Sequence, residues 1–458
     1  MFLLRILLWS GLCCASSVLA GREVLPFDYG WKHRTGLTDW AEPNELPPAK
    51  TDPGLNPKEA VPEYDDSDWL DVQLPHDGLI VNAPSQDACP DGCSGRSYIP
   101  RHVLWYRNSF SLPKHWLEDH QSSTDSGVGS VLSLEFEGSF RNTTVWLNGR
   151  RVLNHVCGYT PFRIELKPEL LRASSSDSKQ TIAVFVDPDN GDGGGSSRGS
   201  GWWYEGGGLY RHVRLVKTQA VHVEPNGLFV KSQFPSYFEK GRTATASLHM
   251  EASIVTNRGS KLCYGFEVTS PDGQMVASIA PQAIPVADPD DTSSTAIVVH
   301  DSVNIQNPAM WTSAEPYLYQ IDVVLIKCDD GDPQNEQNEL DRVSVQHGIR
   351  KIQFDANHGF FLNDQNFKIR GFCDHDTFAV VGMAIPDRIN LFRVSMACYR
   401  NMISRCVRLL VGPNLTWLLS FLYTRPKHPG ALEAMEDVLP TIRPILRYWI
   451  SMIDSAWS

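Results

Sequence analysis

Apolar and polar residues alternate along many short stretches of the first 350 residues. In residues 130–140, Leu132, Leu134 and Phe136 fall on one face of an extended chain, while serine and glutamate residues fall on the other. This period of two predicts a β-strand with one buried and one solvated face. Further strand-like stretches lie at residues 69–80, 103–113, 144–155, 158–166, 181–187 and 208–216. Many short strands with almost no helical periodicity predict a β-sandwich.

Turn residues and a second series of strands extend this pattern. Asn148 and Gly149 form the dipeptide most typical of a tight β-hairpin turn, which predicts a hairpin over residues 144–155. The second series lies at residues 221–232, 245–257, 262–270, 294–303, 317–328 and 343–351. Its spacing and number of strands are typical of an immunoglobulin-like sandwich. We therefore predict two successive β-sandwiches, at residues 21–218 and 219–350.

Residues 348–387 predict a different kind of structure. The short apolar stretch at residues 368–372 predicts a strand, and Cys373, Asp374, His375 and Asp376 follow it directly. A short strand followed by acidic and imidazole side chains is how a β/α barrel presents groups at its C-terminal rim.

These segments together resemble the N-terminal part of a glycoside hydrolase of family 2, in particular of its β-galactosidase branch. The resemblance covers residues 22–394 and rests on the motifs WLDVQLPHD, WYRNSFSLP, VWLNGRRV, CGYTPFRIEL, WWYEGGGLYRHVRL, NPAMWTSAEPYLYQIDV, GFFLND and KIRGFCDHDTFAVVGMAIPDRINLF. The last roughly 60 residues do not match. The resemblance implies a galactose-binding-like jelly roll at residues 21–218, an immunoglobulin-like sandwich at 219–350, the start of a (β/α)8 catalytic barrel at 351–394 and a divergent tail at 395–458.

The same resemblance implies the hydrolysis of O-glycosidic bonds by a retaining mechanism, which needs two carboxylates. In the family, the general acid is a glutamate that follows an asparagine on the fourth barrel strand, and the nucleophile is a glutamate further on. Both lie beyond the matching region. The sequence ends at residue 458, whereas a barrel that starts at residue 351 needs about 250 residues. We therefore expect a chain truncated before its catalytic glutamates, with no catalytic residue of its own and no activity by itself.

Four residues are candidates for substrate binding. The resemblance implies that His375 and Asp376 lie near the sugar at the barrel rim, although such polar residues can also satisfy backbone groups in a loop. Trp203 and Tyr204 offer aromatic faces for a sugar ring, although aromatic clusters beside a strand also pack the end of a sandwich. We expect no cofactor or metal in this chain, whereas Mg²⁺ can serve the full-length family.

The net charge and the first 20 residues indicate which partners and which cellular location to expect. The formal charge of −12 argues against a nucleic-acid partner, because binding phosphates needs clustered lysine and arginine. Residues 1–20 combine Arg5, an apolar run and a small-residue cleavage site, which predicts a secretory signal peptide. The run is short for a membrane span. We expect a secreted or lumenal protein, either extracellular or lysosomal, with a β-glycoside or oligosaccharide as partner, no membrane partner, and an oligomer as an open option.

Cysteines and asparagines complete the list of candidates. Of the ten cysteines, eight remain after the predicted signal peptide is removed, and an oxidising compartment permits disulfides among them. Cys89 and Cys93 form the best local pair, while a zinc site there lacks a second close pair; the spacing leaves the connectivity open. Asn142 and Asn414 fit the N-glycosylation rule.

Two other hypotheses remain open on the sequence alone. One is a non-catalytic secreted protein that uses the two sandwiches to bind carbohydrate or another partner. The other is a defective product whose barrel fragment exposes open strand edges.

Overall fold

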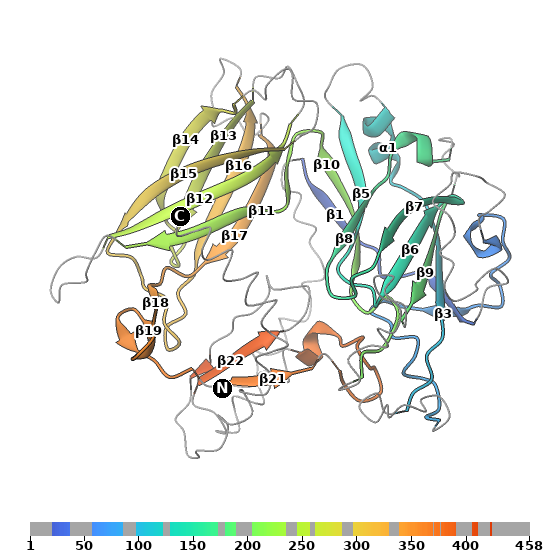
Figure 1. The fold of residues 1–458 in the computed structure, drawn as a ribbon. Helices are drawn as coiled ribbons and strands as arrows, with labels where there is room; N and C mark the ends of the chain where they lie inside the picture. Colours follow the sequence, from blue (N-terminus) through green and yellow to red (C-terminus); the bar gives the residue numbers. More distant parts are fainter. Residues whose placement is uncertain are drawn as a thin grey trace, which may run out of the picture.

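A computed structural model of the chain (Figure 1) describes fourteen segments of the sequence. They are residues 21–36, 57–85, 98–121, 129–172, 179–188, 204–234, 245–256, 262–285, 296–328, 339–369, 371–375, 377–390, 405–410 and 422–423. The predicted signal peptide, Cys89, Cys93 and Asn414 lie outside the described residues. Strands dominate, and the described helical elements are short: α1 (Lys114–Gln121), the 3-10 turns η2 (Lys58–Ala60) and η6 (Pro168–Leu170), and a turn at residues 387–390. The prediction of a mainly β protein is confirmed.

The first sandwich consists of a four-stranded and a six-stranded antiparallel sheet. The four-stranded sheet has the order β1-β10-β5-β8 and the six-stranded sheet the order β3-β2-β4-β9-β6-β7. Their strands are β1 (Glu23–Pro26), β2 (Trp31–Thr35), β3 (Leu70–Val72), β4 (Leu104–Phe110), β5 (Ser130–Phe136), β6 (Asn142–Leu147), β7 (Arg150–His155), β8 (Phe162–Glu165), β9 (Gln180–Asp187) and β10 (Val213–Gln219). Residues from both sheets, among them Leu134, Val145 and Val184, fill one apolar core.

Three strands of the six-stranded sheet, β4, β6 and β9, are buried on both of their faces. On β4, Leu104 and Tyr106 point into the core between the sheets, whereas Trp105 belongs to a second apolar cluster on the outer face. Residues 57–69, hereafter the outer segment, cover that face with Ala60 and Trp69. Because of this cover, β4, β6 and β9 lack the exposed face that strict alternation would give them.

The second sandwich is a three-stranded sheet packed on a four-stranded one. Their orders are β11-β12-β15 and β14-β13-β16-β17. The strands are β11 (His222–Gln233), β12 (Thr245–Val255), β13 (Leu262–Thr269), β14 (Met275–Ala283), β15 (Ala296–Gln306), β16 (Tyr319–Lys327) and β17 (Glu339–His347). A disulfide joins Cys263 on β13 to Cys328, one residue beyond β16.

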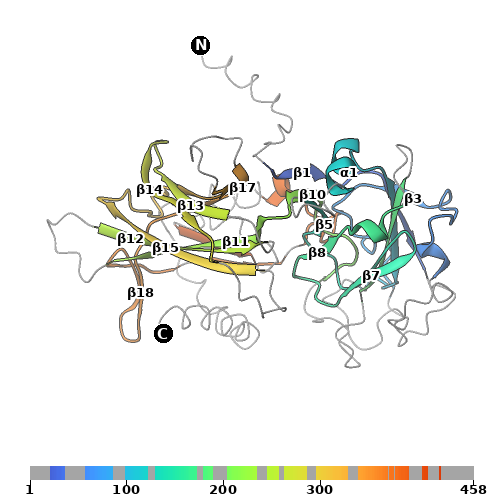
Figure 2. The same cartoon turned by 90° about the horizontal axis from the view of Figure 1, so that it is seen from above.

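An ion pair fixes the start of the first sandwich to the second. The Arg22 guanidinium lies 2.8 Å from the Asp341 carboxylate and donates to the carbonyl of Val223 at 2.8 Å. The chain passes from the first sandwich to the second over a few residues: β10 pairs with β5 up to Gln219, and β11 pairs with β12 from His222. Figure 2 shows the two sandwiches side by side, with β1 and β10 next to β17.

The remaining strands follow the second sandwich. A small sheet contains β18 (Ile352–Asp355), β19 (Gly359–Leu362) and β20 (Gln365–Asn366). Then β21 (Gly371–Asp374) pairs in parallel with β22 (Arg405–Leu410), and β22 pairs antiparallel with β23 (Leu422–Tyr423). A parallel pair joined by a crossover is the unit from which a β/α barrel starts. The second partner, β22, lies in the stretch predicted as a divergent tail. Figure 1 shows β21 and β22 below the two sandwiches.

Candidate functional site

The candidate site is the junction at which residues 377–387, shortly after β21, lie on one end of the first sandwich (Figure 1). Asp77 is at its centre, with 3% of its surface exposed. Its carboxylate accepts hydrogen bonds from the backbone N–H groups of Met383 at 2.9 Å, Leu79 at 3.0 Å and Gly207 at 3.3 Å. One side chain of the first sandwich therefore holds backbone from three segments.

Tyr204 completes the set of donors around this carboxylate. Its hydroxyl lies 3.0 Å from each carboxylate oxygen of Asp77. Gly206 and Gly382 bring their backbones against the same carboxylate, and both have positive φ angles, of 62° and 58°. A Cβ atom at either position would overlap the Asp77 Oδ2 atom. Glycine is thus required twice for the close approach.

Burial is the largest cause of the pKa shifts of Asp77 and Tyr204. Burial raises the pKa of the Asp77 carboxyl, while the bonds from Met383, Leu79, Tyr204 and Gly207 oppose that rise by favouring the ionised form. Burial and the neighbouring Asp77 carboxylate raise the pKa of the Tyr204 phenol, so Tyr204 stays a donor. The result is a buried carboxylate whose hydrogen-bonding capacity is used by protein groups.

Two imidazoles lie next to this carboxylate inside the sandwich. His76 Nδ1 is 2.9 Å from the hydroxyl of Tyr106, and His33 Nδ1 is 3.1 Å from the carbonyl oxygen of Trp105. The two imidazole rings lie 4.8 Å apart. Burial lowers the pKa of each histidine to about 4, so both imidazoles are neutral at neutral pH.

A third histidine links the sandwich to the far end of the junction. His212 Nδ1 lies 2.8 Å from Asp28 Oδ2, and its Nε2 lies 3.5 Å from Asp387 Oδ2. These two partners, Asp28 first, raise the pKa of His212 to about 10. The hydrogen bond with His212 in turn lowers the pKa of Asp387. His212 is therefore a cation between two carboxylates, one on each side of the junction.

The structure places two of the four predicted substrate-binding residues at this junction. His375 is exposed directly after β21, and its carbonyl accepts the N–H of Thr377 at 2.7 Å. Tyr204 is half-buried, and its ring lies against Gly382, in the segment that begins at His375. The hydroxyl of Tyr204 is directed at Asp77, which is a structural contact in this conformation. Trp203 and Asp376 lie outside the described residues.

Asp77, the residue that organises the junction, is not among the site residues predicted from the sequence. Its signal was the sequence Pro75-His76-Asp77-Gly78 at the end of a strand. An aspartate can accept the N–H two residues further on, and Asp77 does so with Leu79. No local pattern showed that Gly207 and Met383 would share the same carboxylate.

The structure also describes Asn142, one of the two predicted glycosylation sites. Asn142 is 3% exposed, and its Oδ1 accepts a hydrogen bond from Asn154 at 3.0 Å, which argues against a glycan on this residue in the folded protein. Within the described residues, no group of three or more histidine, cysteine, aspartate or glutamate side chains is placed to hold a metal ion. The described part of the chain also has no helix long and apolar enough to span a membrane.

The architecture consists of two antiparallel sandwiches followed by the first parallel strand pair of a β/α unit. Residues 229–350 match the model of the glycosyl hydrolases family 2. The β-galactosidase BoGH2A of Bacteroides ovatus is 28% identical over 378 residues, which is 82% of this chain and 37% of the relative. A putative β-glucuronidase of Formosa agariphila is 26% identical over 320 residues, 70% of this chain and 26% of the relative.

Solved structures show the same fold. A glycosyl hydrolase family 2 member from Bacteroides cellulosilyticus superimposes with a TM-score of 0.62 at 24% identity, covering 84% of this chain and 42% of that protein. The β-glucuronidase of Bacteroides uniformis gives a TM-score of 0.61 at 22% identity, covering 83% and 38%. The chain is thus similar to the N-terminal part of glycosyl hydrolases family 2 proteins, and residues 229–350 match that family's model. It spans well under half the length of the relatives it matches.

Proposed function

We propose that this chain forms the substrate-flanking N-terminal part of a β-glycosidase, with β-galactosides as its substrate class. The 28% identity with a β-galactosidase over 378 residues is the observation that carries the proposal. The junction adds support, because residues 375–387 follow the strand whose C-terminal end faces the substrate in a β/α barrel. Other relatives are named β-glucuronidases, so the type of sugar is the part of the proposal that most needs a test.

The role of the described residues is to shape and hold the binding rim. The hydrogen bonds that surround Asp77 leave it poorly placed as an acid, base or nucleophile, and we assign no catalytic residue among the described side chains. A retaining mechanism would draw its two glutamates from the remainder of a complete barrel. In our proposal the first sandwich contributes the position of the loop after β21.

We further propose that the protein is secreted or lumenal. The pattern of residues 1–20 supports a signal peptide. The disulfide between Cys263 and Cys328 supports an oxidising compartment independently, because such bonds are rare in reducing cytosol.

A hybrid enzyme tests the activity. Residues 21–385 would replace the matching part of the Bacteroides ovatus relative, and the purified hybrid would be assayed with chromogenic β-galactoside and β-glucuronide. We expect hydrolysis of the β-galactoside, with the unmodified relative as positive control. A folded hybrid that cleaves the glucuronide alone would reject the galactoside assignment, and one that cleaves neither would reject the proposed function.

The chain without the added barrel is the second arm of this experiment. We expect no hydrolysis of either substrate, because the described residues hold no assigned acid and nucleophile. Turnover that copurifies with the folded chain through two chromatographic steps would show that a catalytic carboxylate pair is present after all.

A further inference from the structure

The Asp77 carboxylate accepts hydrogen bonds that join the first sandwich, the glycine-rich segment at residues 204–208 and the loop after β21. We propose that Asp77 is a positioning residue: it fixes the loop of residues 377–383, so that the first sandwich sets the shape of the substrate-binding rim. The part of this inference that concerns substrate rests on the proposed function, whereas the part that concerns the loop does not.

A short series of hydrogen bonds links Asp77 to His375. The N–H of Met383 donates to the carboxylate at 2.9 Å. Its neighbour Gly382 exchanges two backbone hydrogen bonds with Phe378, each of 2.9 Å, and Thr377 donates to the carbonyl of His375 at 2.7 Å. The loop is thus closed on itself and attached to the sandwich at its base, next to the residue that follows β21.

The sandwich side of this attachment is itself fixed. The backbone N–H groups of His76 and Gly78, on either side of Asp77, donate to the carbonyls of Leu209 at 2.8 Å and Gly207 at 2.9 Å. The Cα of Asp77 is therefore held by backbone pairing, and the carboxylate can be placed accurately. Accurate placement by rigid neighbours is what a positioning residue needs.

An apolar contact supports the same loop. The side chain of Met383 is 3% exposed and packs with Phe140 and Tyr210 of the first sandwich. In contrast, Phe378 and Val380 leave 41% and 88% of their surface exposed. The side of the loop around residues 382 and 383 therefore faces the first sandwich, and the side around Val380 faces solvent.

The donors around residue 77 favour an aspartate at this position. All four groups that reach the carboxylate are donors: the N–H groups of Leu79, Gly207 and Met383 and the hydroxyl of Tyr204. Asparagine has the same shape, but its amide nitrogen is a donor and would face donors. Asp77→Asn therefore keeps the volume of the side chain and removes half of its acceptor capacity.

Hydrogen exchange of the full chain, followed by mass spectrometry of peptides, tests the proposal without any substrate. For Asp77→Asn we expect exchange in a peptide over residues 378–385 to become at least tenfold faster. We expect peptides from β4 and β9, and the midpoint of thermal unfolding, to change little. Asp71→Asn is the matched control, because it makes the same change at an exposed position on β3.

Gly382→Ala provides a second variant in case Asp77→Asn prevents the sandwich from folding. Its added Cβ would meet Asp77 Oδ2 from the loop side, so the same peptide should lose protection while the sandwich stays intact. The inference is overturned if either folded variant keeps wild-type protection at residues 378–385, or if protection falls equally in every peptide of the first sandwich. An inactive hybrid enzyme would reject the proposed function but leave this result unchanged.

Discussion

The two sandwiches bury their strands in different ways. In the second sandwich, β12 alternates between buried and partly exposed positions along its whole length, with Ala246, Leu248 and Met250 inside. In the first, β6 is buried at every position, and β4 at every position except Ser109. The comparison shows that alternation identifies a strand only where one face meets water, because a second covering layer removes the pattern.

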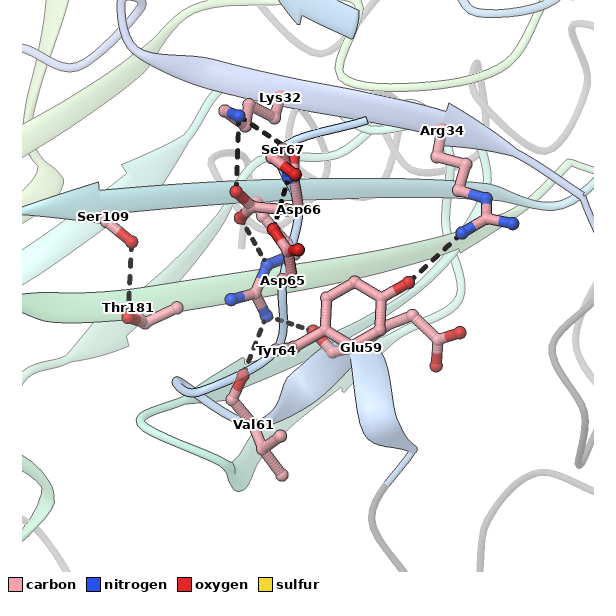
Figure 3. A network of polar contacts seen from close by, with 11 residues as sticks. Lys32, Arg34, Glu59, Val61, Tyr64, Asp65, Asp66, Ser67, Ser109 and Thr181 are labelled. Atoms are coloured by element: carbon pink, nitrogen blue, oxygen red, sulfur yellow. Dashed lines mark hydrogen bonds and ion pairs between the residues drawn. The ribbon is translucent and has the colours of Figure 1, made fainter. Parts of the chain in front are cut away.

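The outer segment is the layer that makes this difference, and Arg107 holds it. The Arg107 guanidinium lies 2.8 Å from Asp66 Oδ2 and donates to the carbonyl oxygens of Glu59 and Val61. Figure 3 labels the partners Glu59, Val61 and Asp66, with Asp66 also close to Lys32, whose ammonium is 3.4 Å from Asp66 Oδ1. An arginine with 1% exposure is thus stabilised by one carboxylate and two carbonyls.

The largest expected effect comes from removing this arginine. Arg107→Met keeps an apolar stem on β4, but it removes the guanidinium that donates to the Glu59 and Val61 carbonyls and pairs with Asp66. We expect the first sandwich to lose about 3–5 kcal/mol of its free energy of unfolding, measured by urea denaturation. Local exchange should be fastest in residues 57–69.

Arg34→Met is the matched control for this prediction. The Arg34 guanidinium lies on the neighbouring strand β2, is about half exposed and is 4.0 Å from Asp68. A change of at most about 1 kcal/mol is expected from such a surface pair. Equal losses in the two variants would show that the outer segment does not depend on Arg107.

The stability of the second sandwich should depend on its disulfide. Replacing Cys263 and Cys328 together with alanine opens a crosslink with a sequence separation of 65. We expect the second sandwich to lose about 2–4 kcal/mol, while the first keeps its stability. Urea denaturation with exchange detected separately in β4 and β16 peptides distinguishes the two sandwiches.

Cys157→Ala serves as the control here, because Cys157 is an exposed free cysteine. A surface change of this kind is expected to stay within about 0.5 kcal/mol. If the double variant destabilises both sandwiches equally, they unfold as a single unit, and the contrast drawn between them holds for structure but not for stability.

A further effect is expected at His212, and it depends on pH. The pKa of His212 is raised to about 10 in the folded protein from an ordinary value of 6.5. Because the folded state binds this proton more tightly, the stabilisation is fully present below pH 6.5 and is lost as the pH rises through 10. The loss of stability caused by His212→Gln should therefore be largest at pH 6 and smallest above pH 10.

Thermal unfolding across this pH range measures the effect. Asp387→Asn should change stability by less than about 1 kcal/mol, because the Asp387 side chain is 80% exposed, whereas Asp28→Asn should have the larger effect. A His212→Gln difference that does not vary between pH 6 and pH 10 would show that His212 is not charged in the folded protein.

Local physics in the sequence determined much of the fold. Alternation identified strands such as β5 and β12, and Asn148 with Gly149 identified a hairpin turn in which both residues have positive φ angles. The parallel start of a barrel after residue 370 was also expected, on the strength of the resemblance. The strands and the turn follow from neighbours a few residues apart, which a single sequence displays directly.

The tertiary structure alone decided the junction and the burial of charge. Asp77 and Met383 are 306 positions apart in the sequence, and Arg107 and Asp66 are 41 apart; no periodicity connects either pair. The sequence named Tyr204 as a surface for sugar, but packing directed its hydroxyl at Asp77. A carboxylate or guanidinium is ordinarily a surface group, so only the arrangement of donors and acceptors brought together by folding shows where burying one is favourable.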